Sequence, residues 1–238
     1  LEKLISDDEY RNRTAHLGYR HVMKNHTYTH RVGHILEQLG MDKEVQSSNP
    51  KVSLVTCTNR PEMIENILKN FRCQIWENRE LIIVIDCEKQ EYAEITNLLR
   101  DEPNTKVHLV TPGLSLGHCF NLGMELSTGD YIGKFDDDDL YGENYISDQL
   151  MAFNYTDADI VGKMCTFMYH EKSESTYLRF PENRHKYGDL ILGPTFLFKR
   201  AVSEKVQMRN LSTGEDTQFI RDSIDAGFRI YSTDPYNF

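Results

Sequence analysis

Short apolar runs alternate with helix-like segments between residues 52 and 135. The run at 81–85 consists of aliphatic residues only, which is typical of a strand that is covered on both faces. Similar runs at 52–56, 107–110 and 131–135 predict three more strands, and apolar stripes at helical spacing separate them. Three strand–helix pairs followed by a strand predict an α/β fold with a mainly parallel central sheet and helices on both faces.

Four consecutive aspartates, Asp136 to Asp139, follow the last of these runs. Adjacent carboxylates repel one another, and a divalent cation removes that repulsion because hard cations prefer oxygen ligands. A solvated acidic turn is the simpler alternative. In parallel sheets ligands bind at the carboxyl ends of strands, where residues 56–60 and Asp86 also lie. This placement predicts a metal and a nucleotide-like ligand at one edge of the sheet.

Residues 1–40 are predicted to be helical and separate from the sheet. The polar stretch 41–50 is typical of a linker, so we expect a helical segment at 1–46 and a second domain at 47–238. Five of the nine histidines of the chain fall in this segment, between His16 and His34.

Within that cluster, His26, His30 and His34 are spaced to share one helix face, as metal ligands can. A helix start at Asn25-His26-Thr27 is the alternative interpretation.

The composition excludes several classes of partner. The formal net charge is −10 with no long basic block, which argues against a nucleic-acid partner. No apolar run approaches the length of about 20 residues that a membrane-spanning helix needs. The five cysteines form no CxxC pair, so we expect free thiols in a reducing compartment, the cytoplasm. Because the chain begins at Leu1, we expect it to be a fragment of a longer protein.

The second half of the chain is less regular. Its patterns predict a helix at 145–153, a strand at 159–161 and a hairpin of two strands at 165–169 and 176–180. The polar stretch 181–194 is predicted to be an active-site loop. A further strand is expected at 195–198, and a helix begins near Asp216, for which helix capping is the simpler role.

From residue 50 to residue 238 the chain resembles the family-two glycosyltransferases, which have a GT-A fold. Five segments in the family's order carry the resemblance: Val52-Ser-Leu-Val-Thr-Cys-Thr-Asn-Arg60, Glu80-Leu-Ile-Ile-Val-Ile-Asp86, Leu116-Gly-His-Cys-Phe-Asn121, Gly129-Asp-Tyr-Ile-Gly-Lys-Phe-Asp-Asp-Asp-Asp139 and Gly214-Glu-Asp216. The resemblance implies a GT-A fold for this part of the chain.

The resemblance also implies roles for particular residues. The family's DxD motif falls on Asp136-Asp137-Asp138, where Asp136 and Asp138 would hold Mn²⁺ or Mg²⁺ on the diphosphate of a sugar nucleotide. The aspartate of its Glu-Asp motif, the general base, falls on Asp216. The implied donor-binding residues are Thr56, Asn59, Arg60, Asp86, Asn121, Asp136 and Asp137.

The implied activity is that of an inverting, metal-dependent hexosyltransferase. It would move a sugar from a nucleotide-diphosphate sugar, a UDP-sugar first, to a hydroxyl of a saccharide or glycoconjugate acceptor. We place this work in cell-surface or spore polysaccharide synthesis, in the cytoplasm or at the inner face of the membrane. The QxxRW motif of processive synthases is absent from the sequence, which favours transfer of single sugars.

Two other functions remain open at this point. A sugar-nucleotide nucleotidyltransferase uses a similar sheet, but it would carry a glycine-rich basic loop after the first strand, where Thr58-Asn-Arg-Pro61 has no glycine. An inactive homologue that only binds a sugar or a nucleotide is the other alternative.

The first segment has a resemblance of its own. The stretch Gly18-Tyr-Arg-His-Val-Met-Lys-Asn-His-Thr-Tyr-Thr-His-Arg31 is similar to the C-terminal end of CgeB-like, GT-B-type glycosyltransferase domains. This similarity implies an upstream transferase domain whose tail forms residues 1–46.

Overall fold

The computed structural model describes residues 1–41 and 49–238, and it divides them into two units, Leu1–Asn49 and Pro50–Phe238. Most of the predicted linker, and the predicted boundary between residues 46 and 47, lie outside the described residues.

The first unit is helical, as its sequence predicts. It consists of α1 (Glu2–Ser6), α2 (Asp8–Asn25) and α3 (Tyr28–Gln38). The Thr27 side chain accepts a hydrogen bond from the backbone N–H of His30 and so caps α3, as the helix-start interpretation expects. His26 therefore ends α2 instead of joining His30 and His34 on α3, and the idea of one helix face shared by all three is wrong.

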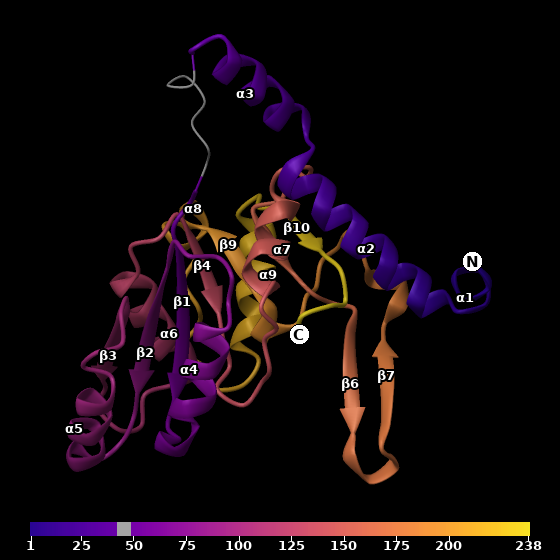
Figure 1. Cartoon of the computed structure of the whole chain (residues 1–238). Coiled ribbons are helices and arrows are strands. Elements are labelled where there is room, and N and C mark those ends of the chain that lie inside the picture. Colours follow the sequence, from indigo (N-terminus) through magenta and orange to yellow (C-terminus); the bar gives the residue numbers. More distant parts are fainter. Residues whose placement is uncertain (42–48) are drawn as a thin grey trace. The chain divides into compact units, whose positions relative to one another are not determined.

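The second unit is built on an eight-stranded sheet in the order β3-β2-β1-β4-β9-β5-β10-β8 (Figure 1). One half is parallel and contains β1 (Val52–Thr58), β2 (Arg79–Ile85), β3 (Thr105–Leu109) and β4 (Tyr131–Lys134). The other half contains β5 (Ile160–Gly162), β8 (Lys186–Tyr187), β9 (Leu197–Lys199) and β10 (Ile230–Ser232). Within it β5 and β10 are parallel, whereas β8 and β9 run antiparallel to their neighbours.

Helices cover both faces of this sheet and bury two apolar layers. One layer contains the buried apolar side chains of α4 (Ile64–Arg72), α5 (Lys89–Leu98) and α7 (Tyr145–Ala152) together with the odd-numbered aliphatic residues of β2. The other layer contains the buried apolar side chains of α6 (Leu116–Leu126) and α9 (Glu215–Asp225) together with Ile82 and Val84 of β2, and Phe219 of α9 packs there on Phe198 of β9. The aliphatic run in β2 is unbroken because both faces of this strand are covered by helices. The prediction of an α/β fold with a mainly parallel sheet is confirmed.

In the second half of the chain the predicted hairpin forms, but several short elements differ from the expectation. The predicted hairpin forms as β6 (Thr166–His170) and β7 (Ser175–Arg179), and Figure 1 shows it extending away from the main sheet. The predicted loop 181–194 contains the edge strand β8, while β10 and the short helix α8 (Arg200–Ser203) were not expected. These elements are two to four residues long, so they are too short to show a period in the sequence.

Within the described ranges, no helix combines the length and the apolar content that a crossing of the bilayer requires.

A buried carboxylate forms hydrogen bonds between neighbouring segments at the amino ends of the strands. Glu80 on β2 is 3% exposed and accepts hydrogen bonds from the hydroxyls of Ser53 and Thr128 and from the Thr128 backbone N–H. The ammonium group of Lys51 lies 3.0 Å from its other oxygen. Burial alone would raise the pKa of Glu80, but these donors outweigh it and lower the pKa to about 2.

We predict that Glu80→Gln lowers the free energy of unfolding at pH 7 by about 2–3 kcal/mol. The lowered pKa means that the ionised group stabilises the fold above pH 4.5, its usual pKa, and that this contribution is lost as the pH falls towards 2. Urea denaturation of both proteins between pH 7 and pH 2.5 measures how this contribution to the free energy of unfolding changes with pH. Glu77→Gln, at an exposed site nearby, is the matched control, and equal stability of the two variants at pH 7 would contradict the prediction.

Candidate functional site

The four aspartates lie in a turn directly after β4, and two asparagines of α4 hold the backbone of that turn. The Asn66 amide donates to the carbonyls of Asp137 and Asp139, and the Asn70 amide donates to the carbonyl of Asp139. The Asn70 side-chain oxygen also accepts the backbone N–H of Tyr141. Because Asn66 and Asn70 are one helical turn apart, one face of α4 fixes the shape of the turn.

Tyr141 connects the acidic turn to the segment that precedes β9. Its ring stacks on Phe135 with centroids 3.9 Å apart. Its hydroxyl accepts the backbone N–H of Asp136 at 2.9 Å and donates to the carbonyl of Pro194 at 2.8 Å. The position of Asp136 is therefore tied to a segment that lies nearly sixty residues further along the chain.

Arg60 compensates the charge of two of the four carboxylates. Its guanidinium forms two hydrogen bonds with the buried carboxylate of Asp137, and it lies 3.0 Å from Asp138. Thr58 at the end of β1 donates its hydroxyl to the same Asp137 carboxylate. These hydrogen bonds raise the pKa of Arg60, so the guanidinium stays charged. Asp137 is thereby a structural anchor of the turn.

Lys134 connects the acidic turn to Asp216. This lysine ends β4 and is 3% exposed, and its ammonium group lies 3.0 Å from Asp136 and 3.1 Å from Asp216. Burial would lower the pKa of Lys134, but the two carboxylates outweigh it and raise the pKa. A buried charged lysine between two carboxylates brings into one site two motifs that are eighty residues apart in the sequence.

Asp216 lies in the first turn of α9 without capping the helix. The N-cap is Gly214, with a positive φ of 79°, and no side chain makes a capping hydrogen bond. A Cβ atom on Gly193 would come within 1.8 Å of the Asp216 Oδ2 atom, so only glycine allows this close approach. The Asp216 Oδ1 atom is buried and has no hydrogen-bond partner among the described residues. The simpler role as a cap is therefore absent, and one carboxylate oxygen keeps a hydrogen-bonding capacity that no described residue uses.

The other predicted donor residues occupy different positions. Thr56 is fully buried, and its hydroxyl has no hydrogen-bond partner among the residues that the structure describes. Asn59 is exposed directly after β1, and the Asp86 carboxylate at the end of β2 accepts the backbone N–H of Gly113. Both ends of the Asn121 amide bond to the backbone of Met208, which gives that side chain a structural role. The predicted donor contacts of these four residues stay predictions.

Sequence reasoning missed the roles of five residues that organise the site: Thr58, Asn66, Asn70, Lys134 and Tyr141. Lys134 carried a signal that could have been used, because it is a charged residue inside an otherwise apolar run. Such a residue is buried only if it is paired.

The residues present fit a divalent cation. Asp136 and Asp138 offer hard oxygen ligands, with side chains 33% and 52% exposed. Burial raises the pKa of the neighbouring Asp139 to about 6, and the charges of Asp136 and Asp138 add to the rise. Arg60 and Lys134 supply two positive charges against four adjacent carboxylates and Asp216. A further cation would complete the balance.

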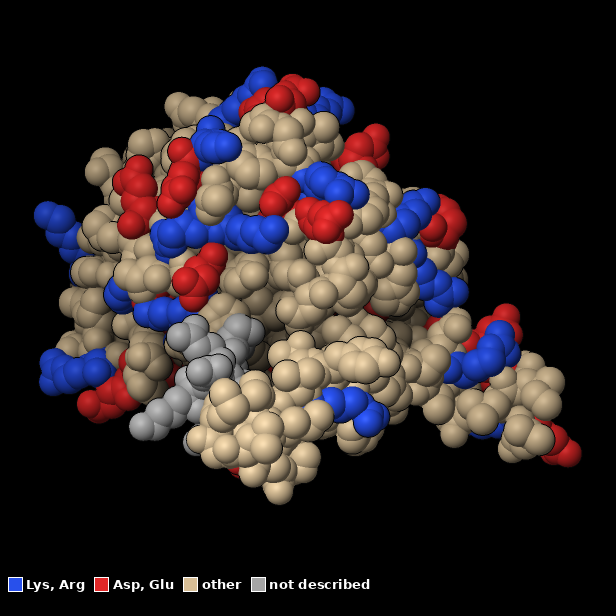
Figure 2. Space-filling view, turned by 90° about the horizontal axis from the view of Figure 1, so that it is seen from above, with Lys and Arg blue, Asp and Glu red and all other residues tan. Residues whose placement is uncertain are grey.

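The face seen from above mixes basic and acidic side chains without a broad field of one sign (Figure 2).

Comparison with known sequences places this chain in a family. Residues 53–210 match the sequence profile of glycosyl transferase family 2. A glucosyl-dolichyl phosphate glucuronosyltransferase of Haloferax volcanii is 28% identical over 116 residues, which are 47% of this chain and 37% of that protein. The uncharacterized glycosyltransferase YibD of Escherichia coli is 24% identical over 156 residues, which are 64% of this chain and 44% of that protein. The chain thus matches less than half the length of these relatives.

Solved structures share the fold. The first 349 residues of TarS from S. aureus superpose with a TM-score of 0.61 at 19% identity, covering 78% of this chain and 59% of that one. The mannosyltransferase PcManGT from Pyrobaculum calidifontis superposes with a TM-score of 0.63 at 16% identity, covering 80% of this chain and 56% of that one. With the sheet, the acidic turn and the family profile in agreement, the chain belongs to glycosyl transferase family 2.

Proposed function

We propose that residues 50–238 form an inverting, metal-dependent glycosyltransferase. It moves a hexose-type sugar from a nucleotide-diphosphate sugar, first of all a UDP-sugar, to a hydroxyl of a saccharide or glycoconjugate acceptor. The observation that best supports this function is the ion-paired set of Asp136, Lys134 and Asp216, because it joins a metal-binding turn to a general base.

The relatives support the choice of substrates. The Haloferax volcanii relative is named for a glycosyl transfer, a TarS structure was solved with UDP-GlcNAc, and the PcManGT structure contains GDP-Man and Mn²⁺. We place the activity in cell-surface or spore glycoconjugate synthesis, on the cytoplasmic side of the membrane.

Asp136 and Asp138 would hold the metal. When bound, Mn²⁺ or Mg²⁺ supplies Lewis-acid stabilisation of the negative charge that develops on the departing diphosphate. Arg60 keeps Asp137 and Asp138 in place, and the Tyr141 hydroxyl holds the backbone of Asp136. Thr56 and Asp86, at the ends of β1 and β2, are the proposed contacts for the nucleoside.

Asp216 acts on the acceptor. Its free Oδ1 atom accepts the proton of the attacking hydroxyl, while Lys134 holds the Oδ2 atom and fixes the orientation of the carboxylate. Direct displacement at the anomeric carbon by that hydroxyl inverts the configuration and needs only one base.

The metal assignment predicts a metal-dependent change in thermal stability. A UDP-sugar at about a hundredfold excess over its Kd, with Mn²⁺ present, should raise the Tm by roughly 5–10 °C. Asp138→Asn should lose this shift, whereas Asp101→Asn, at an exposed turn outside the site, should keep it. Thermal-shift measurements with UDP-sugars and GDP-sugars, with and without Mn²⁺, decide the point. A shift of the same size without metal would contradict it.

The base assignment predicts a separation of catalysis from donor binding. Asp216→Asn should lower the turnover number by about 10²–10⁴-fold, because the neutral amide cannot accept the proton. Its donor-induced Tm shift should remain close to that of the unmodified chain. The exposed Asp225→Asn on the same helix is the matched control. Chromatographic detection of released nucleoside diphosphate and of glycosylated acceptor measures turnover, and full turnover in Asp216→Asn would refute the role.

A further inference from the structure

A pocket of about 360 Å³ lies in the second half of the sheet, outside the acidic turn. Its lining residues are Met164, Asn183, Lys186, Tyr187, Gly188, Asp189, Leu190 and Ser232. A volume of this size is at the lower end of the range for small-ligand sites.

The sheet topology places this pocket at the same edge as the acidic turn. β9 is antiparallel to both β4 and β5, so β4 and β5 point in the same direction, and β10 is parallel to β5. The pocket residue Met164 follows β5, and Ser232 ends β10. Lys186 of β8 pairs with Ser232 of β10. The carboxyl ends of β1, β2 and β4 and this pocket therefore occupy two halves of one edge.

The segment between the two halves joins them at the proposed base. Leu190 lines the pocket, and three residues further on Gly193 touches the Asp216 carboxylate. Three residues span at most roughly 10 Å, so the pocket is within reach of an acceptor that also touches Asp216.

This connecting segment is held firmly. Ile191 is buried, the backbone N–H of Leu192 donates to the carbonyl of Lys163, and the carbonyl of Pro194 accepts the Tyr141 hydroxyl. Lys163 itself is fully buried and paired with Asp234. The spacing between the pocket and Asp216 is therefore a fixed property of the fold.

The chemistry of the pocket indicates an uncharged ligand rich in hydroxyl groups. Asn183 offers an amide donor and acceptor, Lys186 a donor and Asp189 an acceptor, while Met164 and Leu190 offer apolar surface. Among the described residues neither Lys186 nor Asp189 has an ion-pair or hydrogen-bond partner for its side chain. One cation and one anion together disfavour a phosphate, which a pocket with only the lysine would attract.

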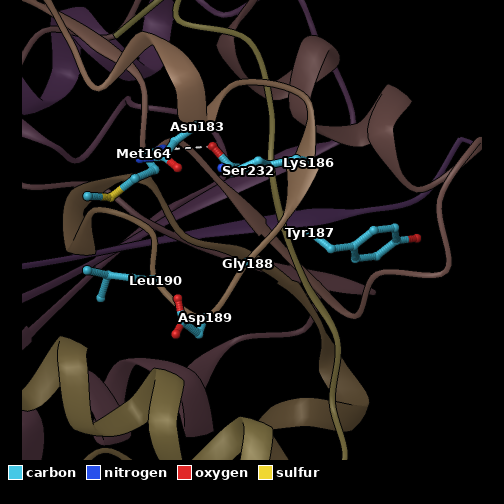
Figure 3. A pocket seen from close by; sticks show the side chains of 8 residues that line it. All are labelled: Met164, Asn183, Lys186, Tyr187, Gly188, Asp189, Leu190 and Ser232. Atoms are coloured by element: carbon cyan, nitrogen blue, oxygen red, sulfur yellow. Dashed lines mark hydrogen bonds between the residues drawn. The ribbon is translucent and has the colours of Figure 1, made fainter.

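The close view shows which side chains remain for a ligand. Met164 and Asn183 lie together at one end of the pocket, Asp189 and Leu190 lie at the other, and the ring of Tyr187 points away (Figure 3). The Tyr187 hydroxyl already accepts the backbone N–H of Asp157, and its ring packs against Tyr231. Tyr187 therefore shapes the wall of the pocket with its backbone.

We infer that this pocket binds an uncharged sugar unit of the acceptor and presents its hydroxyl group to Asp216. This inference rests on the proposed function, since it assigns the acceptor to one half of the sheet edge and the donor to the other. Asp189 and Asn183 orient the sugar through its hydroxyl groups, and Leu190 covers an apolar face of the ring.

The test uses the full chain with 4-nitrophenyl glycosides of glucose, galactose, mannose and N-acetylglucosamine as acceptor probes, and glucose 6-phosphate as a charged probe. Asp189→Ala should raise the acceptor KM about tenfold while leaving the donor KM and the donor-induced Tm shift within twofold. Asp225→Ala, an exposed site on α9, should change neither. Asp189→Lys should move the preference towards the phosphorylated probe.

Saturation-transfer NMR with the same probes measures binding independently of turnover. Unchanged acceptor KM and binding in both Asp189 variants, with donor binding retained, would overturn this inference and leave the proposed function standing. Failure of every neutral sugar to bind would overturn it as well. Absence of any metal-dependent donor binding would instead count against the proposed function itself.

Discussion

The whole site depends on how the chain compensates the negative charge that it gathers after β4. Arg60 neutralises Asp137 and approaches Asp138, while Lys134 lies between Asp136 and Asp216. Each basic residue serves two carboxylates, so the protein balances only part of the charge. The cluster is thus stable enough to form and retains the excess of negative charge that a divalent cation can satisfy.

Residues that stabilise the fold and residues of the candidate site lie at opposite edges of the sheet. At the amino ends of the strands, the buried Glu80 is fully satisfied by hydroxyl, backbone and ammonium donors. Near the carboxyl end of β1 and in the first turn of α9, Thr56 and Asp216 each keep a buried oxygen atom without a partner among the described residues. A fold stabilised at one edge can keep unsatisfied groups at the other edge, where a ligand can use them.

The carboxylates of the candidate site could be predicted from the sequence, but most of the residues that form hydrogen bonds or ion pairs with them could not. Four adjacent aspartates and the Gly-Glu-Asp motif are local signals that can be found in the sequence. Thr58 and Tyr141 carry no such signal, and Lys134 carries only its charge within an apolar run. The roles of all three arise from contacts with residues up to eighty-two positions away. For Asn121 the motif did carry a signal, which predicted a contact with the sugar-nucleotide donor. In the structure its side-chain amide is hydrogen-bonded to the backbone of Met208.

By itself, the sequence determined the alternation of strands and helices, the mainly parallel sheet and the edge at which the aspartates lie. These features follow from periodicity within short windows, which local side-chain patterns specify directly. Only the tertiary structure decided the antiparallel β8 and β9, the pairing of Lys134 with Asp216, and the approach of Gly193 to that carboxylate. Such features depend on contacts between distant parts of the chain, and these exist only once the sheet has brought its two halves together.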